Sequence, residues 1–167
     1  MIRLGVVALA ALLSGVPVLA DCAGTVLVSC QIKGSSKWLD LCLTGGALRY
    51  SFGPKGAPEL VLERDVGDVV YTPWPGVGRT IWEDVQIRNK GITYAVHTWV
   101  ERPIDDSDPG SSGTGVAVLR GEEPLAEIEC AGEQTADFTP LGEALVAQGY
   151  CRAVDRWKRG PGGWYCE

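Results

Sequence analysis

Histidine, long apolar runs and helical periodicity are all scarce in this chain of 167 residues, and each scarcity excludes a class of protein. The single histidine, His97, has no second imidazole with which to share a metal ion, and the cysteine spacings are not those of a zinc site. After the first twenty residues, no apolar run approaches the roughly 20 residues that a membrane-spanning helix needs. No serine occupies the centre of a glycine-x-serine-x-glycine turn, the usual nucleophile turn of α/β hydrolases. We therefore expect no metal ligand, no cofactor, no membrane span and no catalytic residue.

The N-terminus has the layout of a secretory signal peptide. Arg3 supplies a short positive start, residues 4–13 are apolar, Pro17 interrupts the run, and small residues end at Ala20. An apolar stretch of about ten residues is too short to anchor the chain in a bilayer. We predict that residues 1–20 are a signal peptide cleaved near Ala20, which places the mature chain in the periplasm or outside the cell.

All of the cysteines follow this segment, and their number is even. An even count after an export signal is typical of disulfides formed in an oxidising compartment, so we predict three. Six cysteines allow fifteen pairings, and the sequence does not choose among them; Cys151 and Cys166 are expected to hold the C-terminal segment down, with a bond to each other as one arrangement. The cysteines are Cys22, Cys30, Cys42, Cys130, Cys151 and Cys166.

Acidic residues outnumber basic ones, but unevenly along the chain. Residues 21–151 carry ten basic and nineteen acidic side chains, a net charge of -9, whereas residues 152–167 carry four basic and two acidic, a net charge of +2. An acidic body repels nucleic acid and anionic lipid, and it suits a cationic partner. The basic end, with Arg152, Arg156, Lys158 and Arg159 beside three aromatic residues, either neutralises this body or contacts an anionic glycan or lipid.

Period-two alternation, interrupted by glycine-rich turns, predicts a mostly β fold. No strand–helix–strand rhythm occurs, which argues against a parallel sheet, so we expect an antiparallel barrel or sandwich of about eight strands. One helix is predicted at 139–149, and the glycine-rich stretch 157–167 is expected to be irregular. We place an antiparallel β domain at residues 21–132, and a helix with a disulfide-held basic tail at 133–167. The predicted strands are 25–32, 37–43, 47–52, 59–64, 82–89, 92–101, 116–120 and 125–130.

The segment 72–82, TPWPGVGRTIW, is the leading candidate for a contact surface. Its two prolines end the strand ladder and stiffen the chain, which lowers the entropy lost when a partner binds. Trp74, Arg79 and Trp82 are of the residue types that dominate binding hot spots. The structural alternative is that Trp74 folds back over the open end of the β fold and Arg79 pairs with a nearby carboxylate.

Three other groups offer weaker candidates. His97 is a neutral-pH proton carrier, but Glu101 on the same strand lies too far along to orient it. Glu127 and Glu129 share a strand face roughly 6.5–7 Å apart, a separation that overlaps those used in glycoside hydrolysis, although a solvated strand face is the favoured interpretation. Asp105, Asp106 and Asp108 supply calcium-type oxygens without the complete binding loop.

The segments 50–62, 72–82 and 125–130 resemble those of small exported bacterial proteins that are usually left uncharacterised, a resemblance that implies a periplasmic setting. A fainter similarity is to the c-type lysozyme inhibitor family, which has a small antiparallel barrel and a loop that inserts into the lysozyme cleft. Gly76-Val77-Gly78-Arg79-Thr80 is similar to that loop, with Val77 and Thr80 in place of its serine and tyrosine, and Asn89-Lys90-Gly91 resembles the family's later turn. The resemblance implies Arg79 and Lys90 as contacts, and Cys30 and Cys130 as the flanking cysteines.

The sequence thus predicts an exported, non-catalytic protein that binds a protein or a glycan, with Trp74, Arg79, Trp82 and Lys90 as contacts. The alternatives are an inhibitor of a lysozyme-like cell-wall hydrolase, a small periplasmic hydrolase and a structural envelope protein. The sequence sets no oligomeric state.

Overall fold

Nine strands form one antiparallel sheet in a computed structural model that describes residues 22–105, 107–161 and 163–167. The segment predicted as a signal peptide lies outside these residues. The strand order is β4-β3-β2-β1-β9-β8-β7-β6-β5, and every ladder in the sheet is antiparallel, which confirms the predicted fold class. The strands are β1 Thr25–Ile32, β2 Lys37–Thr44, β3 Ala47–Pro54, β4 Leu60–Asp65, β5 Val70–Thr72, β6 Thr80–Asn89, β7 Ile92–Glu101, β8 Ser111–Arg120 and β9 Glu123–Ala136.

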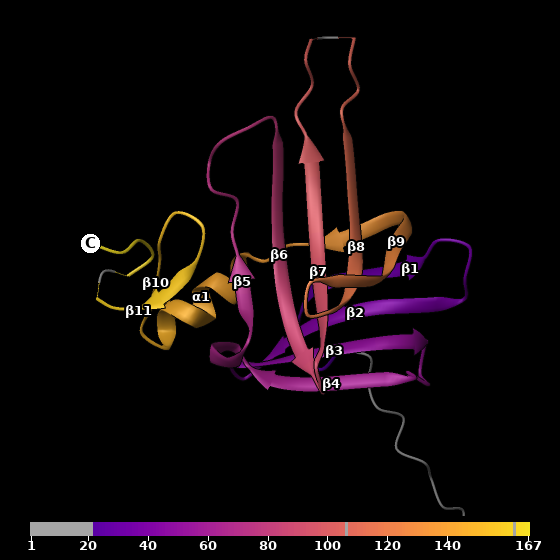
Figure 1. Ribbon diagram of the computed structural model, residues 1–167, viewed down its shortest axis with the longest axis horizontal. Coiled ribbons are helices and arrows are strands. Elements are labelled where there is room, and N and C mark those ends of the chain that lie inside the picture. Colours follow the sequence, from indigo (N-terminus) through magenta and orange to yellow (C-terminus); the bar gives the residue numbers. More distant parts are fainter. Residues whose placement is uncertain (1–21, 106, 162) are drawn as a thin grey trace, which may run out of the picture.

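The long strand β9 joins two halves of the sheet that cross at a steep angle (Figure 1). Its first part pairs with β8 up to Glu129, and its second part pairs with β1 from Cys130 onward. Strands β1–β4 lie across the view in Figure 1, whereas β6–β8 stand upright and project beyond them. The projecting ends of β6–β8 carry Trp82 and adjoin the loop that holds Trp74 and Arg79.

The sheet is strongly curved but not closed. Its edge strands β4 and β5 follow one another in the chain, linked through the short 3-10 helix η1 (Val66–Asp68). A side-chain contact joins β4 to β6, where Arg64 Nη2 donates to the carbonyl of Arg88 at 2.9 Å. No ladder joins β4 to β5 among the described residues, so the fold is an open, barrel-like sheet.

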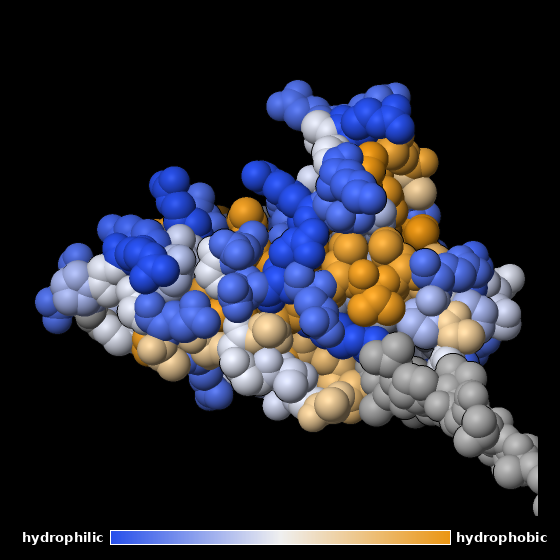
Figure 2. Space-filling view, turned by 90° about the horizontal axis from the view of Figure 1, so that it is seen from below, coloured by the Kyte–Doolittle hydropathy of each residue, from blue (hydrophilic) through white to orange (hydrophobic). Residues whose placement is uncertain are grey.

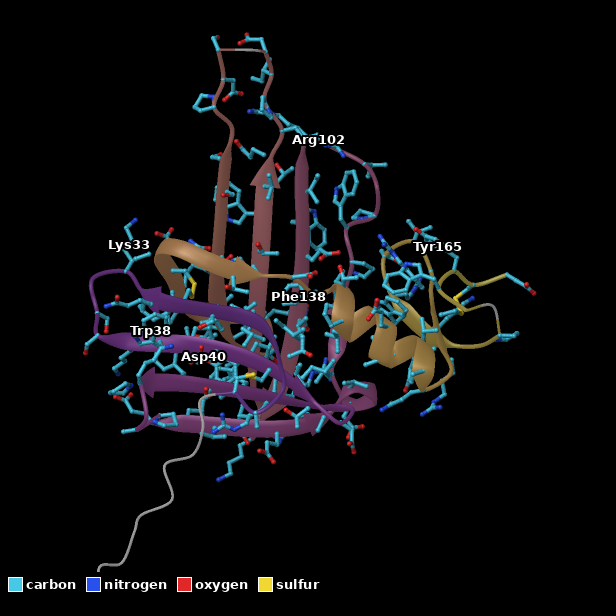
Figure 3. All side chains as sticks on the ribbon, turned by 180° about the vertical axis from the view of Figure 1, so that it is seen from behind. Lys33, Trp38, Asp40, Arg102, Phe138 and Tyr165 are labelled. Atoms are coloured by element: carbon cyan, nitrogen blue, oxygen red, sulfur yellow. A yellow bond between two sulfur atoms is a disulfide. The ribbon has the colours of Figure 1, made fainter. Side chains whose placement is uncertain are left out.

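The core lies between the two crossing halves, because the period-two pattern of each strand turns its apolar side chains to the same side. Helix α1 (Thr139–Ala147) adds Leu141 and Leu145 to this core, and Phe138 precedes the helix there (Figure 3). The boundary predicted at residue 132 falls inside β9, so both predicted segments share one core. The largest fully buried side chains are those of Tyr50, Phe138, Leu27, Leu39, Leu41, Leu48, Ile87, Leu141, Val28, Val66, Val85 and Val96.

Two stretches that lie outside the predicted strands and helix are regular in the structure. Residues 111–115 begin β8, although serine and glycine dominate them, because they pair with the end of β7. In the C-terminal segment, β10 (Tyr150–Arg152) pairs with β11 (Trp157–Arg159), so the prediction for 157–167 was wrong at its start. Both stretches gain their regularity from a partner strand, which local composition does not reveal.

Three disulfides are present, as predicted, and they join Cys22 to Cys42, Cys30 to Cys130, and Cys151 to Cys166. They fit a chain that folds in an oxidising compartment.

No helix within the described ranges has the length and apolarity that crossing a bilayer requires. Seen from below, apolar side chains gather in the middle of the molecule, and the end that carries the C-terminal segment is more hydrophilic (Figure 2).

Candidate functional site

The 73–79 loop connects β5 to β6, and it is held in place by its own groups. Trp74 Nε1 donates to the carbonyl of Val77 at 3.0 Å, and the Arg102 guanidinium lies 4.7 Å from the indole centroid. Gly76 and Gly78 have φ values of 88° and 91°, in the left-handed region where glycine is favoured. The Trp74 ring is therefore half-buried within its loop rather than presented freely to solvent.

The side chain of Arg79 is partly exposed, and it contacts groups of the same molecule. Its Nε donates to the carbonyl of Arg102 at 2.7 Å, and its Nη2 lies 2.8 Å from Asp108 Oδ2 and 3.8 Å from Glu101 Oε2. Backbone N–H groups of Gly110 and Ile104, together with the Arg79 charge, hold the pKa of Asp108 below its ordinary value. This arrangement matches the structural alternative for Arg79, in which it ties the tips of neighbouring loops together.

Lys90 lies far from the other three predicted contacts. It sits in the turn between β6 and β7 with a φ of 49°, whereas Arg79 and Trp82 lie at the opposite end of that hairpin. A ten-residue strand spans roughly 30 Å, so one small ligand cannot touch both ends. The structure brings Trp74, Arg79 and Trp82 to one end of the sheet and leaves Lys90 at the other.

A pair of tryptophans, which the sequence pattern alone did not single out, lies on the outer face of β6 and β7. Trp82 and Trp99 are direct partners in the ladder, and the side chain of Trp82 is 38% exposed. Gly113 of β8 is the ladder partner of Trp99 on its other side, and a Cβ placed on Gly113 would lie 2.8 Å from the Trp99 ring. The Trp99 indole therefore lies flat across the backbone of β8. The combination of two tryptophans at paired positions with a glycine opposite is the signal that would have identified this pair.

Carboxylates surround the tryptophan pair on the same face. In the neighbouring row, Asp84 is the ladder partner of His97, and burial raises the pKa of Asp84 against the lowering effect of its hydrogen bonds. His97 Nε2 lies 3.3 Å from Glu127 Oε1, and Glu129 pairs with Lys33 at 3.0 Å. The face consequently combines two large aromatic surfaces with an excess of negative charge.

The His97–Glu127 pair is the arrangement closest to catalytic chemistry. An imidazole oriented by a carboxylate is half of a hydrolytic triad, but the pair also requires a nucleophile on the same side. Ser112 and Thr114 lie on the adjacent strand β8, yet they are the ladder partners of Val100 and Thr98 and so point to the opposite face from His97. No hydroxyl within the described ranges donates a hydrogen bond to His97.

Metal binding finds no support among the described residues, where no group of three or more His, Cys, Asp or Glu side chains gathers. The carboxylate of Asp105 instead accepts hydrogen bonds from the backbone and hydroxyl of Ser107. The carboxylate of Asp108 accepts a hydrogen bond from Arg79 Nη2. Asp106, the third oxygen donor considered for calcium, lies outside the described residues.

The 73–79 loop and the basic C-terminal segment, treated as separate candidates in the sequence, meet in the structure. Arg152 Nη2 donates to the carbonyl of Trp74 at 2.6 Å, and Tyr71 donates its hydroxyl hydrogen to Glu83 Oε1 at 3.1 Å just beneath. Burial raises the pKa of Glu83, while the Tyr71 hydrogen bond and the Arg152 charge act against that rise. Between the loop and the segment lies a hollow of about 650 Å³, whose lining includes Trp74, Arg152, Lys158 and Tyr165. Figure 3 shows Tyr165 on the side of the C-terminal segment that faces the loop.

Comparison of the chain with protein-family models, with curated proteins and with solved structures finds no match in any of the three.

Proposed function

We propose that the protein is a non-catalytic binding protein whose main contact surface is the outer face of β6–β8, and that its partner is a protein with a basic surface. The observation that carries this proposal is the pairing of the exposed Trp82 with the half-buried Trp99 on the adjacent strand. Tryptophan is the residue type most enriched at binding hot spots, because its large flat side chain buries much apolar area with few rotatable bonds.

The pair is also held ready for contact. The ladder fixes the backbone of both tryptophans, and the missing side chain at Gly113 lets the Trp99 indole settle against β8. A surface that is ordered before binding loses less conformational entropy when the partner arrives. This support favours a rigid docking face over a flexible loop that folds around its ligand.

The charge around the pair favours a basic partner. Glu101 pairs with Arg79, and Glu129 pairs with Lys33. Among the described residues, Asp84 and Glu127 have no lysine or arginine partner and share the neighbouring imidazole of His97. Lysine and arginine side chains of a partner are attracted both to these carboxylates and to the faces of the indole rings. The acidic body, with a net charge of -9 over residues 21–151, steers such a partner toward the molecule.

We further propose that the chain is exported and acts in the periplasm or outside the cell, after removal of residues 1–20. The support is the signal-like N-terminus together with three disulfides, which persist in oxidising compartments.

The test uses a c-type lysozyme as the basic probe and an acidic protein of similar size as its counterpart, with binding measured by calorimetry at low and at high salt. We expect the lysozyme alone to bind, and we expect Trp82→Ala and Trp99→Ala each to weaken binding at least about tenfold, as for hot-spot residues. Trp38→Ala is the matched control, since Trp38 lies on β2 with Lys55 3.8 Å above its ring. Binding that is equal in all variants would refute the tryptophan face, and binding of a neutral glycan in place of the lysozyme would redirect the proposal to saccharides.

The narrower version of this proposal is inhibition of a lysozyme-like cell-wall hydrolase through the 73–79 loop. Arg79 would then have to exchange its contacts with Asp108 and Glu101 for acidic groups in the enzyme cleft. We expect Arg79→Ala to relieve inhibition while Lys55→Ala does not. If micromolar protein slows none of several lysozymes, this version is excluded, while binding through the tryptophan face stays testable by calorimetry.

The 3.3 Å contact of His97 with Glu127 favours one second candidate, a small hydrolase. Loss of a hydrolytic activity in His97→Ala, with the fold intact, would support it. A protein that neither binds nor hydrolyses would leave a disulfide-stabilised envelope protein as the remaining interpretation.

A further inference from the structure

The hollow between the 73–79 loop and the C-terminal segment is a second site, separate from the tryptophan face. Its volume of about 650 Å³ lies within the range of small-ligand pockets. Neither Trp82 nor Trp99 is among the described residues that line it. Its chemistry differs from that of the tryptophan face, because two cations, Arg152 and Lys158, are among its lining residues.

Arg152 is the central group of this hollow. Its side chain is half-buried, and its guanidinium offers five N–H donors, of which one hydrogen bond is made, to the carbonyl of Trp74 at 2.6 Å. In the described part of the chain no carboxylate forms an ion pair with the guanidinium, and the nearby Glu83 carboxylate already accepts from the Tyr71 hydroxyl. The remaining N–H donors favour an anion in the hollow, because a hydrogen bond between two charged groups is stronger than one between neutral groups.

A second cation lies on the same wall. Lys158 of β11 is exposed, and it too lacks an ion pair within the described ranges, whereas the neighbouring Arg156 is paired with Asp155 at 3.4 Å. Glu167 contributes one carboxylate to the lining. Arg152 and Lys158 therefore bring two cations to the lining of the hollow, beside Glu167.

Aromatic side chains complete the hollow. Trp74 lines it from the loop, and Tyr165, which is 65% exposed, lines it from the C-terminal segment, with the Arg152 guanidinium 6.0 Å from the tyrosine ring centroid. Aromatic rings that remain partly in water suit an amphipathic ring with an apolar face and a polar rim. A pyranose sugar has this character, since its C–H groups form one face and its hydroxyls the edge.

The walls are fixed before any ligand arrives. The Cys151–Cys166 disulfide closes the segment, and the backbone of Arg152 donates to Trp164 and accepts from Cys166 at 2.7 Å and 3.1 Å. The hydrogen bond from Arg152 to Trp74 then joins the segment to the loop. Such preorganisation lowers the entropic cost of binding.

We propose that this hollow binds a sugar that carries a carboxylate, with Arg152 and Lys158 facing the carboxylate and Trp74 and Tyr165 against the sugar ring. The ligand is thus an anionic saccharide. This inference does not depend on the tryptophan face, and either can fail without the other.

The experiment is a titration of the ¹⁵N-labelled full chain, followed by NMR, with N-acetylmuramate and separately with N-acetylglucosamine. The two sugars share the same ring and acetamido group, and only the first has a carboxylate. We expect N-acetylmuramate to cause saturable shifts of the Trp74 indole and of the amides of Arg152 and Tyr165. N-acetylglucosamine should bind at least about tenfold more weakly, because it lacks the charge-assisted contacts.

Variants separate the site from the surrounding charge. Lys158→Gln, at an exposed position that should leave folding intact, and Arg152→Gln should each weaken N-acetylmuramate binding several-fold. Arg156→Gln, on the same segment but not lining the hollow, and Lys55→Gln, over the ring of Trp38, are the matched controls and should bind as the wild type does. Equal binding of both sugars, shifts confined to other residues, or an unchanged Kd in Lys158→Gln would each overturn the proposal.

Discussion

At the scale of single residues, Glu83 is a partly buried carboxyl group that lies near a charged side chain. Its carboxylate accepts from the Tyr71 hydroxyl and from the backbone of Trp74, next to the charge of Arg152. Since burial raises its pKa, the folded protein holds the Glu83 proton more tightly than the unfolded chain does. The stability that follows is present at acid pH and is lost as the pH rises through the folded-state pKa of Glu83.

We expect Glu83→Gln to remove part of this pH dependence, because the amide keeps an acceptor oxygen and cannot titrate. The free energy of unfolding of the variant, relative to that of the wild type, should be larger at neutral pH than at acid pH in urea titrations. Tyr71→Phe should have the opposite effect on the slope, because it deletes a hydrogen bond that lowers the pKa of Glu83. Asp84, whose pKa is also raised, is present in every variant and cancels in the comparison. Parallel pH profiles for Glu83→Gln and wild type would contradict this account.

At the scale of elements, the C-terminal segment is attached to the rest of the fold by aromatic packing on α1. Trp157 stacks on Tyr71 of β5 with centroids 5.8 Å apart and meets Trp164 edge-on at 5.4 Å. Both tryptophans lie over Gly142, where an added Cβ would come within 2.6 Å of the Trp164 ring. A glycine in a helix is normally a weakness, but here it makes room for the segment that forms one wall of the hollow.

Gly142→Ala is therefore expected to destabilise the protein although alanine is the better helix former. The gain in helix propensity is about 1 kcal/mol, and overpacking against the two indoles costs about 1–3 kcal/mol, so we expect a net loss of up to about 2 kcal/mol in urea unfolding. Glu143→Ala on the exposed side of α1 is the control and should change stability by less than about 0.5 kcal/mol. A stabilised Gly142→Ala would mean that the segment does not pack on the helix as described.

The projecting ends of β6–β8 form the other element-scale unit. Arg79 links Glu101 at the end of β7 to Asp108 in the segment that follows β7. Because these groups are exposed, salt screens the link, and the tryptophan pair below it is held mainly by the strand ladder.

At the scale of the whole molecule, β9 and one disulfide join the two halves of the sheet. Cys30 on β1 is bonded to Cys130 at the point where β9 changes partner from β8 to β1, across a sequence separation of 100 residues. A bond that closes so long a loop restricts the unfolded chain more than one that closes a short loop. The bond between Cys151 and Cys166 spans only 15 residues.

Removal of the long-range disulfide should therefore cost more stability than removal of the short-range one. We expect Cys30→Ala with Cys130→Ala to lower the free energy of unfolding by about 4–5 kcal/mol, and Cys151→Ala with Cys166→Ala by about 3 kcal/mol. Urea unfolding of both double variants under identical oxidising conditions measures the difference. The reverse order would show that the C-terminal segment contributes more to folding than the junction at β9.

The sequence by itself determined the features that depend on near neighbours. Alternating strands such as 92–101, the turns between them, the helix near 139–149 and the presence of three disulfides follow from side-chain type and spacing over a few residues. The contact candidates were recognised as residue types in the same way, and Trp74, Arg79, Trp82 and Lys90 remain predictions as binding residues. The opposing alternatives for Arg79, contact or internal pairing, were both chemically sound, and only its distance to Asp108 distinguishes between them in the unbound protein.

Only the tertiary structure decided which distant side chains meet. Ladder register places Trp82 beside Trp99, and the paired strands bring Glu127 to His97 across a sequence separation of thirty residues. Packing of the C-terminal segment on α1 brings Arg152 to Trp74. The regular pairing of 111–115 and of β10 with β11 arose in the same way, from partner strands and not from composition. The physical reason is that strand pairing and core packing act between residues far apart in the chain, and local preferences carry no information about which partner a strand will find.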